Sequence, residues 1–239
     1  MDITRSSAHG HADHGWLSSH HTFSFGHYYN PDQIGFSDIR VINDDRVVPG
    51  KGFGEHSHRD MEIFSYVLEG ALEHKDTMGT GSIIRPGDVQ MMSAGSGVAH
   101  SEYNPSRTES VRFLQIWVIP SELGAKPRYQ QNHYSENEKR GRLRLIISPD
   151  GAVNSLQIRQ DVRIYAGMFN GNEAATFTLS ENRYAYIHIA RGQINVNGES
   201  LDEGDGAKIR DKQLLNFTNG KNCELLFFDL RPIEYPKQT

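Results

Sequence analysis

Short runs of β-branched, aliphatic and aromatic residues recur along the whole chain, and Gly, Pro, Asn and Asp separate them. None of these runs keeps a long 3.6-residue period, so the pattern predicts strands rather than helices. The predicted strands cover residues 40–43, 63–68, 89–92, 111–119, 143–147, 184–189, 193–196 and 224–230. Many short strands joined by turns are typical of sandwiches and barrels, so we expect an all-β fold with few short helices.

A weak internal repeat divides the chain. A strand, a turn at glycine, a return strand and a Gly-Asp turn occur twice, and the first turns fall at Gly70 and Gly192. Two copies of one β-barrel or jelly-roll unit explain this pattern better than one irregular domain. The polar, charged segment between the copies predicts a linker. We therefore expect domains at residues 1–133 and 134–239.

Composition excludes several classes of protein. The 239 residues carry a net charge of −5 without a basic stripe, which argues against direct nucleic-acid binding. No stretch approaches the roughly 18 apolar residues of a membrane span, and the first residues lack the apolar run of a secretory signal. The single cysteine, Cys223, excludes an intrachain disulfide and is expected to be a small buried residue. Together these features predict a cytoplasmic protein.

The strongest chemical signal is a pair of equally spaced motifs, His56-Ser-His58 and, about forty residues later, His100-Ser-Glu102. Residues two apart in a strand share a face, so each motif would point its side chains one way. If the two strands lie close, three imidazoles and one carboxylate converge, and such a set binds a divalent transition metal. Four ligands leave about two positions open on an octahedral ion, which favours catalysis. Glu102 is also a candidate base.

One His-x-His motif alone fits structural hydrogen bonds as well as it fits a metal. The second motif, with the glycine-rich turn at residues 94–97, favours the metal site. In the second half of the chain, Thr178, Ser180, Phe217 and Asn219 stand where the first half carries its candidate ligands. None of these four is a good metal ligand, so we expect the second domain to have no metal site. Its His188 lies in an apolar run and is expected to be a core residue.

Other residues have two interpretations each. Phe53, Met61, Met91 and Trp117 are candidates to line an apolar pocket for a flat aromatic substrate, and each fits an ordinary core equally well.

The histidines and acids near the N-terminus are equally open. His9 and His11 are expected in a polar loop, although a His-rich tract can bind metal. His21 fits either the pocket or packing. Asp44-Asp45 fits a carboxylate pair, but we expect a turn there.

The motifs resemble those of the cupin superfamily. The matching residues are Gly50, His56, His58 and Glu62 in the first motif, and Gly87, Gly95, His100 and Asn104 in the second. Three departures occur. Seven residues, one more than usual, separate Glu62 from Gly70; Ser93 replaces a proline; and four residues rather than two separate Gly95 from His100.

These departures and the surrounding segments resemble the pirin family. The similar segments, dense over about residues 10–130, include residues 14–17, 21–31, 40–45, 56–63, 92–104 and 115–117. The resemblance implies a bicupin with metal in the N-terminal barrel only, held by His56, His58, His100 and Glu102. It implies that Glu62 is not a ligand. Iron is the expected ion, with Zn, Mn, Co, Ni and Cu as alternatives.

The resemblance implies two functions. Bacterial pirin-like proteins include quercetin 2,3-dioxygenases. The resemblance implies that a flavonol would bind the metal through its 3-hydroxyl and that Glu102 would take the proton of this hydroxyl. O₂ would then open the central ring of the flavonol with release of CO. The expected partners are then a small aromatic substrate and O₂. The nuclear pirins of animals act as iron-dependent transcriptional cofactors, which implies a non-enzymatic, redox-sensing alternative with a protein partner. A sugar-ring or small-molecule isomerase is a third class, but its pocket would carry bases rather than four ligands.

Overall fold

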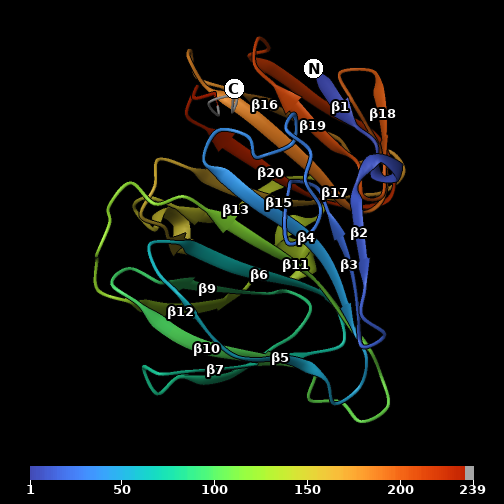
Figure 1. Cartoon of the computed structure of the whole chain (residues 1–239). Helices are drawn as coiled ribbons and strands as arrows, with labels where there is room; N and C mark the ends of the chain where they lie inside the picture. Colours follow the sequence, from blue (N-terminus) through green and yellow to red (C-terminus); the bar gives the residue numbers. More distant parts are fainter. Residues whose placement is uncertain (235–239) are drawn as a thin grey trace.

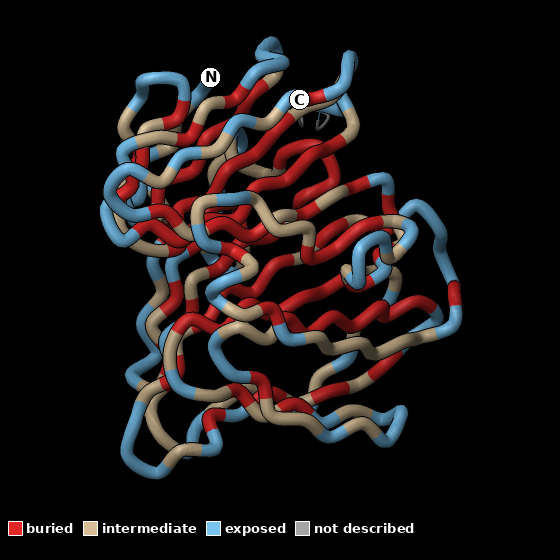
Figure 2. Tube along the Cα trace, turned by 180° about the vertical axis from the view of Figure 1, so that it is seen from behind, coloured by how far each residue is buried: buried red, intermediate tan, exposed pale blue. Residues whose placement is uncertain are grey.

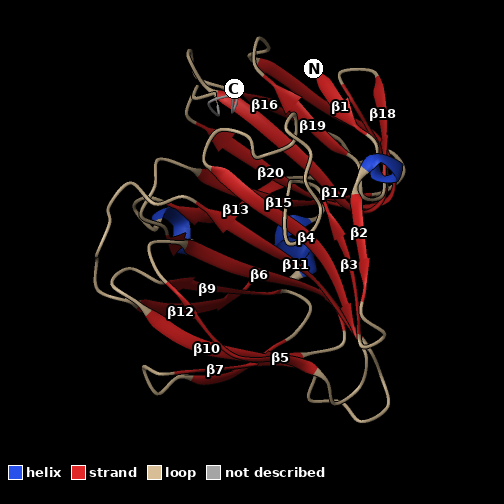
Figure 3. Ribbon diagram, in the orientation of Figure 1, coloured by secondary structure: helices blue, strands red, loops and turns tan. Residues whose placement is uncertain are grey.

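The computed structural model describes residues 1–234 and is built almost wholly of β-strands (Figures 1 and 3). Within these residues, helix is limited to α1 (Glu136–Lys139) and two 3-10 turns, η1 (Ser6–Ala8) and η2 (Ala152–Asn154). The prediction of an all-β fold with few short helices is confirmed. None of the helices in this part of the chain has the length and apolarity that a membrane crossing requires.

The first half of the chain forms two facing antiparallel sheets. The larger sheet has seven strands in the spatial order β12 (Arg128–His133), β9 (Asp88–Ser93), β6 (Glu62–Glu69), β11 (Val111–Val118), β4 (Ile39–Val47), β3 (Leu17–His21) and β2 (Gly10–Asp13). The smaller sheet has four, in the order β5 (Gly52–His58), β10 (Val98–Tyr103), β7 (Leu72–Asp76) and β8 (Gly81–Ile84). Apolar residues of both sheets share one core cluster, which joins them as a jelly roll.

The second half forms one nine-stranded sheet that folds over itself. Its main path is β1 (Asp2–Thr4), β19 (Gly206–Ile209), β17 (Tyr184–Val196), β20 (Leu214–Leu230), β15 (Arg163–Phe169), β13 (Leu143–Ser148) and β14 (Leu156–Gln157). β16 (Ala175–Thr178) pairs with β20, and β18 (Glu199–Asp202) pairs with β17. The long strands β17 and β20 run through the whole upper part of Figure 1 and enclose a second apolar core.

The two repeat glycines behave differently. Gly70, with φ +72°, lies in the predicted turn between β6 and β7. Gly192, with φ +67°, lies inside the continuous strand β17, so the turn predicted there is wrong. The register of β17 against β20 shifts on both sides of Gly192, and a Cβ at this position would collide with the carbonyl oxygen of Lys221. Gly192 therefore bends the strand through a bulge without ending it.

The halves pack through the back of the seven-stranded sheet. Phe64 and Tyr66 of β6 point toward the second half and share a core cluster with Leu226 and Phe228 of β20. Ser65 lies between them on the opposite face and is also buried. β6 is therefore buried on both faces along almost its whole length, and Figure 2 shows the buried trace through the middle of the molecule.

The segment predicted as a linker is part of the fold. Within it, β12 extends the seven-stranded sheet by pairing with β9, and α1 follows directly. The buried Lys139 of α1 donates hydrogen bonds to the Tyr66 hydroxyl at 2.9 Å and the Glu224 carboxylate at 3.0 Å, and so contacts both halves. The predicted boundary between residues 133 and 134 falls between β12 and α1.

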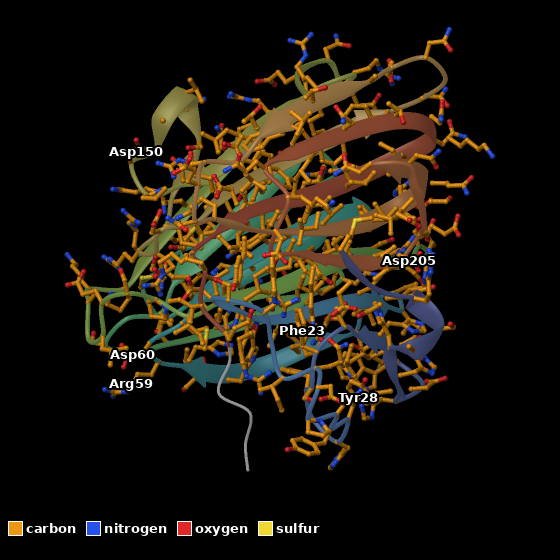
Figure 4. All side chains as sticks on the ribbon, turned by 90° about the horizontal axis from the view of Figure 1, so that it is seen from above. Phe23, Tyr28, Arg59, Asp60, Asp150 and Asp205 are labelled. Atoms are coloured by element: carbon orange, nitrogen blue, oxygen red, sulfur yellow. The ribbon has the colours of Figure 1, made fainter. Side chains whose placement is uncertain are left out.

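Both ends of the described chain reach the opposite half. The N-terminal β1 pairs with β19 of the second half. Arg5 donates to Asp205, labelled in Figure 4, at 2.6 Å. In return, the Arg231 guanidinium donates two hydrogen bonds to Asp38 of the first half, at 2.9 and 2.6 Å.

Candidate metal centre

Three histidines of the first half converge because β5 and β10 are antiparallel neighbours. The register pairs His100 with His56 and places Val98 opposite His58. The ring centroid of His100 lies 4.4 Å from that of His56 and 5.0 Å from that of His58. One ligand nitrogen from each ring lies within 4.8 Å of the other two.

The Nε2 atom of each of these three rings is available to bind a metal. The Nδ1–H of His56 donates to the carbonyl oxygen of Gly54 at 2.8 Å, which leaves Nε2 with its lone pair. The Nε2 atoms of His58 and His100 are buried and have no hydrogen-bond partner among residues 1–234. Because buried polar atoms nearly always have partners, two unpartnered nitrogens in one cluster fit ligation of a transition metal.

The surroundings of His58 and His100 also favour the neutral form of their rings. Burial, followed by the neighbouring His56, lowers the pKa of His58 to about 4. Burial and three neighbouring histidines lower the pKa of His100 to about 2. Both imidazoles are therefore neutral at physiological pH, and their lone pairs are available.

Glu102 lies two residues beyond His100 but not in the three-histidine group. A register shift between His100 and Glu102 separates them on β10. The carboxylate forms a second, overlapping group of candidate ligands with His74 and His100. It accepts hydrogen bonds from Gln115 Nε2 at 2.8 Å and Ser65 Oγ at 3.2 Å. Burial raises the pKa of Glu102 to about 7 against the lowering effect of these hydrogen bonds.

Glu62 lies apart from both groups. Its carboxylate accepts hydrogen bonds from Ser93 Oγ at 2.9 Å and from the backbone N–H of Arg159 at 3.3 Å. These contacts tie β6 to β9 and to the second half.

A row of polar side chains crosses the seven-stranded sheet behind these residues. The register aligns, strand by strand, Gln90, Ser65, Gln115, Asn43 and His21. All five are buried. They bond to one another in part. The single hydroxyl hydrogen of Ser65 is shared between Glu102 and Gln115 Oε1, which lies 2.7 Å away, and His21 Nδ1 lies 2.9 Å from Asn43 Oδ1. This row was not predicted from the sequence, where its only signal is one polar residue within each of several apolar strands.

A cavity of about 620 Å³ opens beside the candidate ligands. His56, His58 and Glu102 border it, and its aromatic lining includes Trp16, Phe25, Tyr28, Phe53 and Trp117. The Trp117 ring lies edge-on to His58, with centroids 4.9 Å apart.

Two of the four predicted pocket residues line this cavity, and two do not. Phe53 and Trp117 line it. Met91 points the other way, into the core between the halves, because it shares a face with its register partner Phe64. Met61 packs against a small apolar cluster around Met92. The cavity therefore lies on the opposite side of β9 from Met91.

The acidic pair Asp44-Asp45 lies on strand β4, so the turn expected there is wrong. The two side chains point to opposite faces. Asp44 accepts hydrogen bonds from Arg112 at 3.0 and 2.6 Å, whereas Asp45 lines the cavity. Asp45 Oδ1 has no hydrogen-bond partner in the described chain, and burial raises the pKa of Asp45 to about 7.

Of the N-terminal histidines considered above, His11 differs from expectation. His11 lies on β2 rather than in a loop, stacks on His20 with centroids 4.5 Å apart, and lines the cavity. His21 lines the same cavity. His9 lies outside β2 and borders a separate cavity between the halves, together with His188.

The second half contains no comparable cluster in the part of the chain that is described, since both groups of candidate ligand atoms lie in the first half. Thr178 is exposed and Phe217 is fully buried in the apolar core. His188 is buried as expected, but neither of its ring nitrogens has a partner within residues 1–234. Cys223 is a buried core residue, as predicted, and burial raises the pKa of its thiol to about 12.

Comparisons with known proteins match both halves. The Pirin family model matches residues 3–118, and the model of the quercetinase C-terminal cupin domain matches residues 145–230. A protein of Escherichia coli strain K12 named quercetin 2,3-dioxygenase is 42% identical, over 97% of this chain and 99% of the relative. A pirin-like protein of Caulobacter vibrioides is 39% identical, over 92% of this chain and 95% of the relative.

Solved structures agree with these relatives. The crystal structure of YhhW from Escherichia coli superposes with a TM-score of 0.93 at 41% identity and covers 98% of this chain and 99% of that one. The structure of the bacterial pirin YhhW in complex with nickel(II) gives a TM-score of 0.92 at 41% identity, over 97% and 99% of the two chains.

Proposed function

This chain belongs to the pirin family, and from that premise we propose that it is a metal-dependent dioxygenase that cleaves flavonols such as quercetin with O₂. The family membership confirms the resemblance found in the sequence. The observation that carries the proposal is the convergence of three imidazoles, two with unpartnered buried Nε2 atoms, at the edge of an aromatic-lined cavity.

The residues proposed to hold the ion are His56, His58, His100 and Glu102. A divalent ion with open positions lowers the pKa of a bound hydroxyl and supplies the redox or Lewis-acid chemistry that reaction with O₂ requires. Iron is the ion we propose, and Zn, Mn, Co, Ni and Cu suit the same donors. The nickel(II) complex of YhhW supports nickel in particular as an alternative.

Glu102 is proposed as the residue that accepts the proton of the substrate hydroxyl. In the metal-free site, burial disfavours the charged form of Glu102 and raises its pKa to about 7, so that the carboxylate readily takes up a proton near neutral pH. Gln115 and Ser65 hold the carboxylate from the seven-stranded sheet. They would hold the carboxylate in place at the wall of the cavity.

The cavity suits a flat, hydroxylated aromatic molecule. Phe53, Trp117 and Trp16 offer apolar faces for stacking, while Asn43 and Asp45 offer hydrogen-bond partners at its floor. A volume of about 620 Å³ lies within the range of small-molecule sites.

The test is turnover. Protein loaded separately with Fe, Mn, Co, Ni or Cu is mixed with quercetin, and the loss of flavonol absorbance is followed together with O₂ uptake. We expect turnover with at least one metal and its loss in His100→Ala, whereas His133→Ala, at an exposed histidine outside the site, should behave as wild type. No turnover with any of these metals, or unchanged turnover in His100→Ala, would refute the proposal. Tight metal binding without turnover would instead favour a regulatory protein.

A further inference from the structure

We infer that His74 and Asp76 are positioning residues that fix the tautomer of His100 and connect it to a buried carboxylate. This inference rests on the proposed metal site but not on the proposed reaction. Neither residue was singled out by the sequence, since His74 and Asp76 lie in the short, partly charged strand β7.

Strand pairing builds this arrangement. β7 lies beside β10 on the side away from β5, and the register places Asp76 opposite His100 and His74 opposite Glu102. The side chains of His74 and Asp76 are fully buried. His74 Nε2 lies 2.9 Å from Asp76 Oδ2, and His74 Nδ1 lies 3.4 Å from His100 Nδ1. The three side chains therefore form a continuous chain that ends at the unpartnered Nε2 of His100.

Only one placement of protons satisfies this chain when His100 Nε2 binds a metal. Nδ1 of His100 then carries the ring hydrogen and donates it to His74 Nδ1. A neutral His74 has one N–H, which must lie on Nε2 and donates to Asp76. Each acceptor meets one donor, so the carboxylate sets the tautomer of His74 and, through it, that of His100.

The two distal members are held firmly. Asp76 Oδ1 accepts the backbone N–H groups of Met78 at 2.9 Å and Thr80 at 3.0 Å, which leaves Oδ2 for His74. The Tyr129 ring packs on the His74 ring, with centroids 4.8 Å apart and planes 33° apart. Because hydrogen-bonded partners of metal-binding histidines commonly change metal affinity 10- to 100-fold, the chain should strengthen binding by about that factor.

Asp76→Asn is the sharpest variant because it keeps the size and removes one acceptor. Whichever way the amide turns, its NH₂ group faces either the His74 N–H or the two backbone N–H groups. If the ring hydrogen of His74 moved from Nε2 to Nδ1 to avoid facing this NH₂ group, it would instead face the Nδ1–H of His100. We expect the dissociation constant for Ni²⁺ or Zn²⁺ to rise about 10- to 100-fold. His74→Phe, which keeps a ring but no nitrogen, should give a similar rise.

Asp88→Asn is the matched control. Asp88 also pairs with a histidine, His133 Nδ1 at 2.8 Å, and also accepts a backbone N–H, that of Arg85 at 2.9 Å. That pair touches none of the candidate ligands. Its removal should leave the metal dissociation constant within twofold of wild type.

The experiment measures Ni²⁺ and Zn²⁺ affinity of the full chain by competition with a chelator, with circular dichroism and the melting temperature as checks of folding. Nitrogen NMR of the zinc-loaded protein reads the protonation of each histidine ring. We expect His74 to carry hydrogen on Nε2 in the wild type and to change in Asp76→Asn, a signature that a purely structural role would not produce.

In a chain that binds metal, three outcomes would overturn the inference. Folded Asp76→Asn with wild-type affinity would remove the carboxylate from any role at the ion. Hydrogen on His74 Nδ1 in the wild type would contradict the proton placement. If His74→Phe abolished binding as fully as His56→Ala, His74 would be a ligand itself. A wild-type chain that binds neither ion would refute the proposed metal site together with this inference, whereas absent turnover with tight binding would refute the proposed reaction alone.

Discussion

The two halves enclose interiors of opposite character. In the second half, Phe217 and Phe227 pack with centroids 6.1 Å apart among aliphatic side chains in an apolar core. In the first half, the inward face of the large sheet carries Ser65, Gln115 and Asn43, and a cavity remains. The interior that holds the candidate site is therefore distinguished by polar residues on its large sheet, whereas the other interior is apolar.

Several members of the polar interior bond to one another, and the apolar core behind the same sheet contributes to stability. Ser65, Gln115 and Glu102 are linked by hydrogen bonds of 2.7 to 3.2 Å. The back of the same sheet contributes Phe64 and Tyr66 to the apolar core shared with the second half. Removing an apolar residue should thus affect folding, and removing a polar one should affect the site.

The largest expected effect is on the apolar side of this comparison. Phe227→Ala removes a buried ring that contacts Phe177 and Phe217, so the free energy of unfolding should fall by about 3–5 kcal/mol. Urea denaturation measures the change. The folded variant should still bind the wild-type number of metal ions. Loss of metal from the folded variant would show that the second half shapes the site.

Asp45 allows a test of the polar side through pH. Burial raises its pKa from 3.8 to about 7, so the folded chain keeps a proton that the unfolded chain loses. Stability contributed by this group should therefore fall as the pH rises from about 4 to about 7. Relative to wild type, Asp45→Asn should gain up to about 4 kcal/mol over that window.

The measurement is urea denaturation of metal-free protein at several pH values between 4 and 8. Asp211→Asn, at an exposed position, is the control and should run parallel to wild type. A constant difference between Asp45→Asn and wild type would contradict the prediction.

Substitutions of Trp117 and of Met91 test which side of the large sheet the substrate contacts. Trp117 lines the cavity beside His58, so Trp117→Ala should raise the KM for a flavonol about tenfold through loss of stacking worth roughly 1.4 kcal/mol. Met91 faces the core between the halves, and Met91→Leu should leave KM unchanged. Steady-state kinetics distinguishes the two. Equal effects would mean that the substrate reaches the other side of β9.

The smallest effect is expected from an attempt to copy the site. Thr178→His combined with Ser180→His restores a His-x-His spacing in the second half, but both positions are exposed and the apolar core behind them offers no ligand. Metal titration should still end at one equivalent. A second tight equivalent would show that spacing alone builds this site.

The sequence was sufficient for the longer apolar strands and for the shared face of His56 and His58, because alternation along a strand is a local property. It did not predict the more polar strands β2 and β12. It could not place Met91, since β9 is buried on both faces and hydrophobicity does not tell the two faces apart. The aligned row through Ser65 and Gln115 depends on register between strands distant in the chain. The bulge at Gly192 looked like a turn because both require the same backbone conformation.

The crossed ends of the chain have a practical consequence for anyone who wishes to study the site in isolation. A fragment that stops after β12 would lack β19, the strand with which β1 pairs, and would leave an unpaired strand edge. It would also expose to water the apolar back of the large sheet, which the second half covers. Such a fragment should aggregate on expression. A bulky tag placed directly before Asp2 would disturb the pairing of β1 with β19, so a purification tag is better placed at the C-terminus.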